Sequence, residues 1–282
     1  MAACGLLALA SACADTAAPR TFCRFVPERA DDFAWENDKI AFRAYGPALR
    51  AGTENGGVDC WLKRVDYPII DKWYKKHVDG GTYHEDSGEG YDPYHVGASL
   101  GCGGIGLWID GKLVTTETFT AHRIIKCEPE ESIFELDFAW EHGGHQYKQT
   151  KRISIKLGDR LFHTVSTFWK DGELATDLPL AVGLTTHDGK AKASSDAKQG
   201  WLACWEEIDG SGLGTGIVMD PSAIAQYKLL KSDTPDEGHA LFIANTDGKG
   251  QVSWWAGFGW ERAGEIKTVG DWKKHLADFS KR

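Results

Sequence analysis

The chain has 282 residues, of which 42% are hydrophobic and 26% are charged; these values are ordinary for a globular protein and argue against general disorder. A formal net charge of −9 argues against a nucleic-acid partner, because such proteins need a basic surface to neutralise phosphates. The charge leaves a small acidic ligand open, since such a ligand responds to local Arg and Lys groups. Twelve Trp residues fit the half-buried faces of β-sheets, and they also suit a surface on which sugar rings stack.

Residues 1–20 are predicted to be a secretory or lipoprotein leader. A short apolar run extends from Gly5 to Ala12, and Ala-Ser-Ala precedes Cys13, although the usual positively charged start is missing. This pattern is typical of an exported chain, either cleaved after Ala12 or lipid-anchored at Cys13. We therefore expect a periplasmic or outer-membrane-anchored protein. No other stretch approaches the roughly 18 apolar residues of a membrane span.

Residues 21–282 are predicted to form a single β-sandwich catalytic domain. Runs of β-branched and aromatic residues, bounded by Gly, Pro or Asp, are typical of short strands. The turns WIDGKLV, IKLGDRL and WKDGELA place Asp-Gly or Gly-Asp between such runs, which is a strong hairpin signal. The predicted strands are 40–45, 59–65, 106–109, 113–116, 122–127, 133–140, 147–155, 161–169, 180–185, 200–206, 216–219, 240–244 and 252–260. Many hairpins without alternating helices favour an all-β, antiparallel fold over a doubly wound sheet.

Few segments outside the predicted strands show a pattern of regular secondary structure. Two short helices are predicted, at 67–76 with Pro68 near its start and at 271–279. The polar segment 190–199 is expected to be an exposed loop. The five cysteines after the leader are widely spaced and lack CxxC spacing, which excludes a standard zinc knuckle and gives weak support for one or two disulfides.

Residues 83–106, YHEDSGEGYDPYHVGASLGCGGIG, contain seven glycines and almost no apolar periodicity. The run GCGGIG lacks the Lys-Ser/Thr ending of a phosphate-binding loop, and no strand–turn–helix unit surrounds it, so nucleotide binding is rejected. We predict an irregular crossing that brings His84, His95 and nearby tyrosines to one side of the sandwich, because loops on a rigid scaffold often carry function. The alternative is that both histidines cap turns or face solvent.

The same stretch is acidic around His84, with Glu85, Asp86, Glu89 and Asp92. A divalent ion near His84, Glu85 and Asp86 stays an open alternative, although the order of the acids lacks the ligand spacing of an EF-hand loop. A solvated acidic loop is the other reading. We therefore assign no metal and no cofactor.

Several stretches together resemble a bacterial family, the domain-of-unknown-function 4861 family. The stretches are residues 36–49, 57–74, 83–108, 183–187 and 254–276, including ENDKIAFRAYGPAL, GVDCWLKRVDYPIIDKWY and WWAGFGWERAGEIKTVGDWKKHL. The resemblance implies an antiparallel β-supersandwich of the galactose-mutarotase-like kind. It also implies an association with polysaccharide utilisation and a dehydratase activity. Such an enzyme would remove water from the non-reducing-end uronic acid of an oligosaccharide and leave a 4,5-unsaturated uronate.

That reaction needs a base for the C5 proton, an acid for the departing O4, and a cation near the carboxylate. From chemistry alone, we assign the base to His84 or His95, and the acid to Tyr94 or the other histidine. His187, in GLTTHDG, closes a strand and either lines the substrate face or occupies a turn.

Four further residues are predicted to bind substrate. Arg123 suits the carboxylate because its planar fork can bind it with two hydrogen bonds, although a surface salt bridge is the alternative. Lys63 lies at a strand end next to the glycine-rich stretch, Tyr91 lies within that stretch, and Trp108 could stack on a sugar. Trp61, Trp73 and the pair Trp254–Trp255 are further stacking candidates, although adjacent strand residues face opposite ways and one of the pair is expected in the core.

Three other functions fit the same features. A glycoside hydrolase needs two carboxylates about 5 to 9.5 Å apart, which the acids at 85, 86, 89 and 92 could supply. An epimerase shares the proton abstraction at C5 with the dehydratase. A carbohydrate-binding lipoprotein needs aromatic platforms and no proton carriers. In each case the expected partner is an acidic oligosaccharide.

Overall fold

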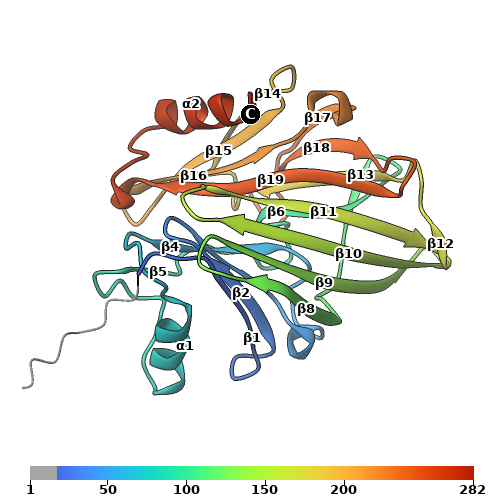
Figure 1. Cartoon of the computed structure of the whole chain (residues 1–282). Coiled ribbons are helices and arrows are strands. Elements are labelled where there is room, and N and C mark those ends of the chain that lie inside the picture. Colours follow the sequence, from blue (N-terminus) through green and yellow to red (C-terminus); the bar gives the residue numbers. More distant parts are fainter. Residues whose placement is uncertain (1–17) are drawn as a thin grey trace, which may run out of the picture.

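A computed structural model describes residues 18–282, which form three antiparallel sheets and two α-helices. The largest sheet has nine strands and runs across the middle of the molecule in Figure 1. Its order is β14 (Lys192–Asp196), β15 (Trp201–Ile208), β16 (Ser211–Val218), β19 (Gln251–Trp260), β11 (Leu161–Lys170), β10 (His145–Lys156), β9 (Glu131–His142) and β8 (Ala121–Cys127), with β12 (Glu173–Leu174) beside β11.

Two five-stranded sheets pack against the large sheet. One has the order β1 (Phe22–Val26), β2 (Asp32–Glu36), β3 (Ala41–Ala44), β4 (Val58–Lys63) and β5 (Gly90–Tyr91). The other has the order β17 (Gln226–Leu230), β18 (His239–Asn245), β13 (Pro179–Thr185), β6 (Cys102–Ile109) and β7 (Lys112–Thr115). The predicted all-β class and antiparallel supersandwich are confirmed.

The helices lie outside the sheets. Helix α1 (Ile70–Val78) packs against β2 and stacks Trp73 on Trp61 of β4, and α2 (Val269–Phe279) covers β15 and β16 at the top of Figure 1. Short 3₁₀ turns occur at Pro47–Leu49, Pro221–Ala223 and Glu261–Ala263. Both predicted helices are confirmed, with boundaries shifted by at most three residues and the end of the second at Phe279 as predicted.

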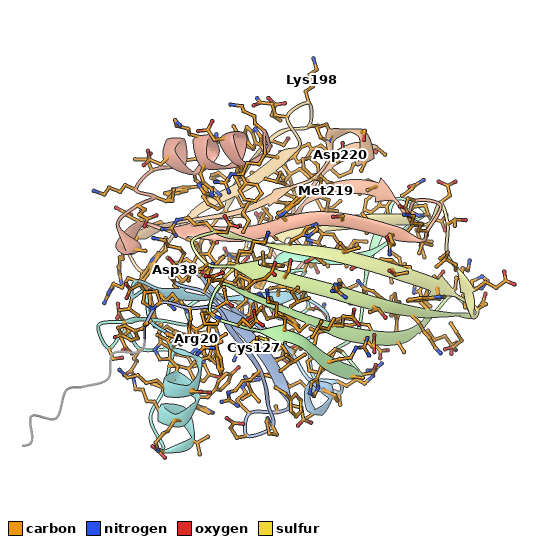
Figure 2. All side chains as sticks on the ribbon, viewed as in Figure 1. Arg20, Asp38, Cys127, Lys198, Met219 and Asp220 are labelled. Carbon is orange, nitrogen blue, oxygen red and sulfur yellow. The ribbon has the colours of Figure 1, made fainter. Side chains whose placement is uncertain are left out.

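The core follows from strand alternation. On β9 every second side chain from Phe134 to Trp140 is buried, and the opposing β10 shows the same period from Tyr147 to Ile155. These residues join side chains of the two smaller sheets in one large apolar cluster. Figure 2 shows side chains filling the space between the sheets.

The hairpins form where the turn residues predict them. Asp110 and Gly111, between β6 and β7, have φ values of 49° and 75°, the left-handed conformation that a tight hairpin turn requires. Asp171 and Gly172 repeat this between β11 and β12. Each turn fixes its strand register and with it the face that each side chain occupies.

Two sequence predictions are wrong in detail. The run GCGGIG is not irregular, because residues 102–106 belong to the buried strand β6. Its glycines sit where added side chains would strike neighbouring backbone or core atoms, as at Gly104 against Leu100. The segment 190–199 is also not all loop, since β14 occupies residues 192–196. The predicted leader falls almost wholly outside the described residues.

Candidate functional site

A cavity of about 380 Å³ opens where four chain segments meet. The loop before β6 contributes Pro93 and His95, and the turn after β13 contributes residues 187–190. The end of β15 contributes residues 206–209, and Pro235 closes the far wall. Two of the predicted catalytic residues, His95 and His187, line this cavity together. Their separation in sequence is bridged by the pairing of β6 with β13.

His187 and Glu206 form the best-ordered polar pair in the cavity. His187 Nδ1 lies 2.7 Å from Glu206 Oε2, and Nε2 lies 2.8 Å from the carbonyl oxygen of His95. Both neighbours are acceptors, so both ring nitrogens must donate, which describes an imidazolium. Burial alone lowers the pKa of His187, but the hydrogen bond and charge of Glu206 outweigh it and the net pKa is raised.

The backbone around His187 is adapted to this role. The residue has a φ of 51°, a left-handed conformation uncommon for a non-glycine side chain. Its N–H donates to Thr185 Oγ1 at 3.0 Å, and the following Gly189 N–H bonds to the Thr186 carbonyl. This tight turn at the end of β13 points the imidazole at Glu206 and away from the solvent, with 12% of the side chain exposed.

His95 lies at the open side of the cavity, with 64% of its side chain exposed. Its Nε2 lies 2.8 Å from Asp236 Oδ1, at an angle outside hydrogen-bond geometry. Neither ring nitrogen of His95 makes a hydrogen bond within residues 18–282, so the ring is available to a ligand. The two histidines therefore differ, because the His187 ring is held by two acceptors and the His95 ring is exposed.

Cationic groups also surround the cavity. Lys190 lines it and pairs with Asp188 at 2.6 Å, and it is otherwise exposed. Arg262 donates to the backbone carbonyl of Asp209 at 2.5 Å and lies over the Trp260 ring. Of these cations Lys190 lines the cavity together with His187, and the carboxylates of Asp188, Glu206, Glu207 and Asp209 line it as well.

Tyr94 packs against His187, with ring centroids 4.8 Å apart, but its hydroxyl does not enter the cavity. The hydroxyl is buried without a hydrogen-bond partner among residues 18–282. Burial, followed by the neighbouring thiols and Glu206, raises the pKa of this hydroxyl well above its ordinary value. The geometry therefore does not support Tyr94 as the acid.

Tyr91 lies behind the cavity wall. It is 5% exposed and donates to Asp209 Oδ2 at 2.8 Å. Burial, then the charge and hydrogen bond of Asp209, raises the pKa of Tyr91 to about 12. Tyr91 is thus placed to position Asp209, which lines the cavity, and does not itself face a ligand.

His84 does not line the cavity that His95 lines, so the predicted gathering of both histidines there is corrected. Its Nδ1 lies 2.8 Å from the Asp92 carbonyl, and 55% of its side chain is exposed. Asp92 in turn joins a buried cluster around Arg43. Asp92 therefore anchors the segment between the two histidines in the core. The residues after it, Pro93 and His95, line the cavity, whereas His84 before it does not.

Lys63 and Arg123 are also placed away from the cavity. Lys63 is buried and pairs at 2.7 Å with Glu36, whose carboxylate accepts from the N–H groups of Ile69 and Ile70 at the start of α1. The role of Lys63 is therefore to hold a helix start. Arg123 is 62% exposed and pairs with Glu135 across the edge strand β8, which is the surface salt bridge given as its alternative.

Trp108, on β6, is half-buried and packs against the small apolar cluster that includes Leu100 and Ala181, and it does not line the cavity. Trp61, Trp73 and Trp254 are core residues, each at most 3% exposed. The expectation that one of Trp254 and Trp255 is buried is confirmed, since Trp254 donates to Gly103 O at 3.0 Å and Trp255 stacks on His163 on the outer face.

Glu206 was not predicted, although the sequence carries a signal for it. In WLACWEEIDG the residues Leu202, Cys204 and Glu206 share one face of β15, and the first two are core residues. A carboxylate on the buried face of a strand lowers the stability of the fold unless a partner neutralises or hydrogen-bonds it. The partner is His187, which the sequence alone could not place opposite it.

Within residues 18–282 no three His, Cys, Asp or Glu groups converge as a metal site. Of the acids proposed for such a site, Asp86 pairs with Arg64 at 2.7 Å. In the same part of the chain neither α-helix is long and apolar enough to cross a bilayer. The five cysteines at 23, 60, 102, 127 and 204 are free thiols in the structure.

Comparison with known sequences identifies the chain's relatives. The profile of a family described as Domain of unknown function (DUF4861) matches residues 10–282. The chain belongs to this family. An uncharacterized protein, P7, of Formosa agariphila is 37% identical over 272 residues, which cover 93% of this chain and 67% of that protein. The predicted resemblance to the DUF4861 family is confirmed.

Solved structures show looser likenesses. A protein named as an aldose 1-epimerase, from Klebsiella pneumoniae, is 9% identical with a TM-score of 0.37 over 89% of this chain and 83% of that chain. The α-galactosidase AgaA of Geobacillus stearothermophilus, a GH36 enzyme, is 12% identical with a TM-score of 0.30 over 81% of this chain and 37% of that chain. At these values neither likeness bears on the activity of the DUF4861 chain.

Proposed function

We propose that this DUF4861 protein is a carbohydrate-active lyase that removes water from the non-reducing-end uronic acid of polysaccharide-derived oligosaccharides. The product is a 4,5-unsaturated uronate. The observation that carries the proposal is the pairing of His187 with Glu206 in a cavity that His95 also lines. The cavity places an exposed imidazole, His95, beside one that two acceptors hold, His187, and an elimination next to a carboxylate needs such a proton carrier.

In the proposed reaction, Nδ1 of His95 accepts the C5 proton. The electron pair of the C5–H bond forms the C4=C5 double bond, and the C4–O4 bond breaks. The departing O4 takes the proton from the His95 imidazolium and leaves as water, so atoms and charge balance. Throughout, Lys190 lies near the sugar carboxylate and stabilises the negative charge that builds up on it.

Glu206 and Tyr94 act on His187 rather than on the sugar. Glu206 keeps the ring doubly protonated, and Tyr94 packs against one ring face. Because Nε2 of His187 already donates to the His95 carbonyl, His187 also fixes the loop that carries the proposed base. His187 and Glu206 are therefore proposed to set both the charge and the geometry of the site.

The test is to incubate the protein with glucuronate-terminated oligosaccharides and follow absorbance of the conjugated enoate together with product mass. We expect the loss of one water per chain with new absorbance. A gain of water with release of the free uronate would replace the proposal with a glycoside hydrolase, for which the same cavity offers the carboxylates of Asp188, Glu206, Glu207 and Asp209. Unchanged mass with inverted C5 would indicate an epimerase, and binding without conversion would indicate a carbohydrate-binding protein.

We further propose that the protein is exported and held in the periplasm or on the outer membrane. The proposal rests on the apolar run before Ala-Ser-Ala-Cys at the start of the chain. The full-length chain with Cys13→Ser should move from the membrane fraction to the soluble fraction if Cys13 carries lipid. An unchanged distribution would contradict the lipid anchor.

A further inference from the structure

The outer face of the nine-stranded sheet carries a second hollow, of about 550 Å³, that shares no lining residue with the His187 cavity. It lies over β8 to β11, beside β12. Helix α2 covers β15 and β16, and no helix lies over β8–β11 in Figure 1. We call this hollow the outer trough; its lining residues include Asp137, Lys148, Thr150 and Trp169. Its volume is within the usual range for a small-molecule site, about 300 to 1,000 Å³.

Strand register explains why the sheet is hollowed there. Ala139, Lys148, Trp169 and Leu174 are paired neighbours in one row across β9, β10, β11 and β12. Ala121, Asp137, Thr150 and Thr167 form the adjacent row across β8 to β11. Paired side chains point to the same face, so the short alanines lie beside much longer neighbours. The trough is the space that these alanines leave.

Trp169 forms the aromatic wall of the outer trough. It is half-buried and belongs to none of the apolar clusters, whereas Trp254, on the neighbouring strand β19, is fully buried in the core. Its cross-strand neighbour Leu174 is 44% exposed. An indole on a solvent-facing row presents a flat apolar surface with a polar edge, which is the shape that suits the C–H face of a sugar ring.

The polar groups of the outer trough fit the rest of a sugar. Thr150 donates to Asp137 Oδ1 at 2.7 Å, and Oδ2 makes no hydrogen bond within the described part of the chain. That oxygen can accept from a sugar hydroxyl. Lys148 is exposed and, among residues 18–282, forms no ion pair, whereas Arg152 on the same strand is paired with Glu135. Its ammonium is free for an anionic group.

We propose that the outer trough is an auxiliary binding site for one sugar ring of an acidic oligosaccharide. The ring stacks on Trp169, a hydroxyl donates to Asp137, and a carboxylate or sulfate lies next to Lys148. The acidic character of the ligand rests on the proposed function, but the trough requires no catalysis. It would hold a long oligosaccharide on the outer face while one end occupies the His187 cavity of the same or another molecule.

Affinity electrophoresis of the full chain tests the proposal, with a glucuronate-containing polysaccharide in one gel and a neutral polysaccharide in another. We expect Trp169→Ala to weaken retention by the acidic polysaccharide about tenfold, the effect of losing one stacking contact together with its area. Lys148→Gln should remove the difference between acidic and neutral gels, and high salt should do the same to the unaltered protein. The matched control is Lys198→Gln, because Lys198 projects into solvent from the β14–β15 turn (Figure 2).

Three outcomes would overturn the outer trough. If the gel retains Trp169→Ala as strongly as the unaltered protein, and its thermal midpoint is unchanged, then no sugar stacks on Trp169. A Lys198→Gln effect as large as that of Lys148→Gln would reduce the charge effect to nonspecific attraction. A dimer in sedimentation that Trp169→Ala dissociates would assign the trough to a second copy of the chain.

The experiments can reject the outer-trough proposal and the lyase proposal independently of each other. Retention that depends on Trp169 without any conversion of acidic oligosaccharides would keep the trough and reject the lyase. Conversion of short oligosaccharides with retention unaffected by Trp169→Ala would do the reverse. His187→Asn should abolish conversion and leave retention unchanged.

Discussion

Glu206 Oε2 lies 2.7 Å from His187 Nδ1, and the other ring nitrogen of His187 faces a backbone carbonyl. Removing the carboxylate charge should lower the pKa of His187. We expect Glu206→Gln to shift the NMR titration of the His187 ring to lower pH and to reduce conversion of acidic oligosaccharides at least about 100-fold. An unchanged titration would contradict the imidazolium.

The same pair makes stability depend on pH. Because the folded-state pKa of His187 is raised, its contribution is fully present below the ordinary pKa of about 6.5 and is lost as the pH rises through the folded-state value. The difference in thermal midpoint between the unaltered protein and Glu206→Gln should therefore be larger at pH 6 than at pH 9. A difference that grows with pH would be the wrong sign.

Arg43 fastens the glycine-rich stretch to the first sheet. Its guanidinium lies 2.5 Å from Asp59 and 3.1 Å from Asp92, and donates to the Tyr83 hydroxyl at 2.9 Å, all of them buried. Arg43→Met would leave buried carboxylates without a cation, which typically costs about 3–5 kcal/mol. We expect that loss in urea unfolding. A change below about 1 kcal/mol would show that the cluster does not hold the stretch in place.

Lys151 is a further buried lysine, and within residues 18–282 it has no carboxylate partner. It is 2% exposed and lies 4.7 Å from the Phe138 ring centroid, and the one acceptor among the described residues is the Gly56 carbonyl at 3.5 Å. Burial lowers the pKa of Lys151 to about 7. The unfolded chain then binds more protons between about pH 7 and 10, so stability should rise with pH across that window, by up to roughly 4 kcal/mol.

Lys151→Met should remove this rise and be more stable than the unaltered protein at pH 7. Chemical unfolding at pH 7 and pH 9.5 measures both effects. A parallel pH dependence in the two proteins would show that Lys151 stays charged or is solvated when folded.

Arg123 should be dispensable for catalysis. It is exposed and pairs with Glu135 on an edge strand, and such pairs contribute about 0–1 kcal/mol. We expect Arg123→Gln to keep the rate of oligosaccharide conversion within about twofold and the unfolding free energy within about 0.5 kcal/mol. A loss of conversion comparable to that of Glu206→Gln would restore the predicted carboxylate clamp.

Local chemistry made much of the fold predictable. Asp110-Gly111 and Asp171-Gly172 specify hairpins because only a few residues accept the left-handed conformation, and strand alternation separates Trp254 from Trp255. Strands without such signals escaped prediction. Examples are β5, whose two residues only add to the edge of β4, and β14, whose composition is polar.

The candidate site was harder to predict because it depends on pairing between distant strands. His95 and His187 were singled out by residue type and position, but only the pairing of β6 with β13 places them together. Arg123 and Lys63 are similar cations at strand positions in the sequence. Arg123 lies on an exposed edge strand and Lys63 lies in the core. The neighbouring sequence does not predict how deeply either side chain is buried.

The most direct measurement is conversion of a glucuronate-terminated oligosaccharide, followed by product mass, with the unaltered protein, His187→Asn and His145→Asn side by side. Asn accepts the left-handed backbone at position 187, and His145 is a solvent-exposed histidine paired with Asp171 that serves as the matched control. We expect loss of one water with the unaltered protein and His145→Asn, and no detectable loss with folded His187→Asn. Full dehydration by His187→Asn would contradict the assignment of catalysis to this cavity.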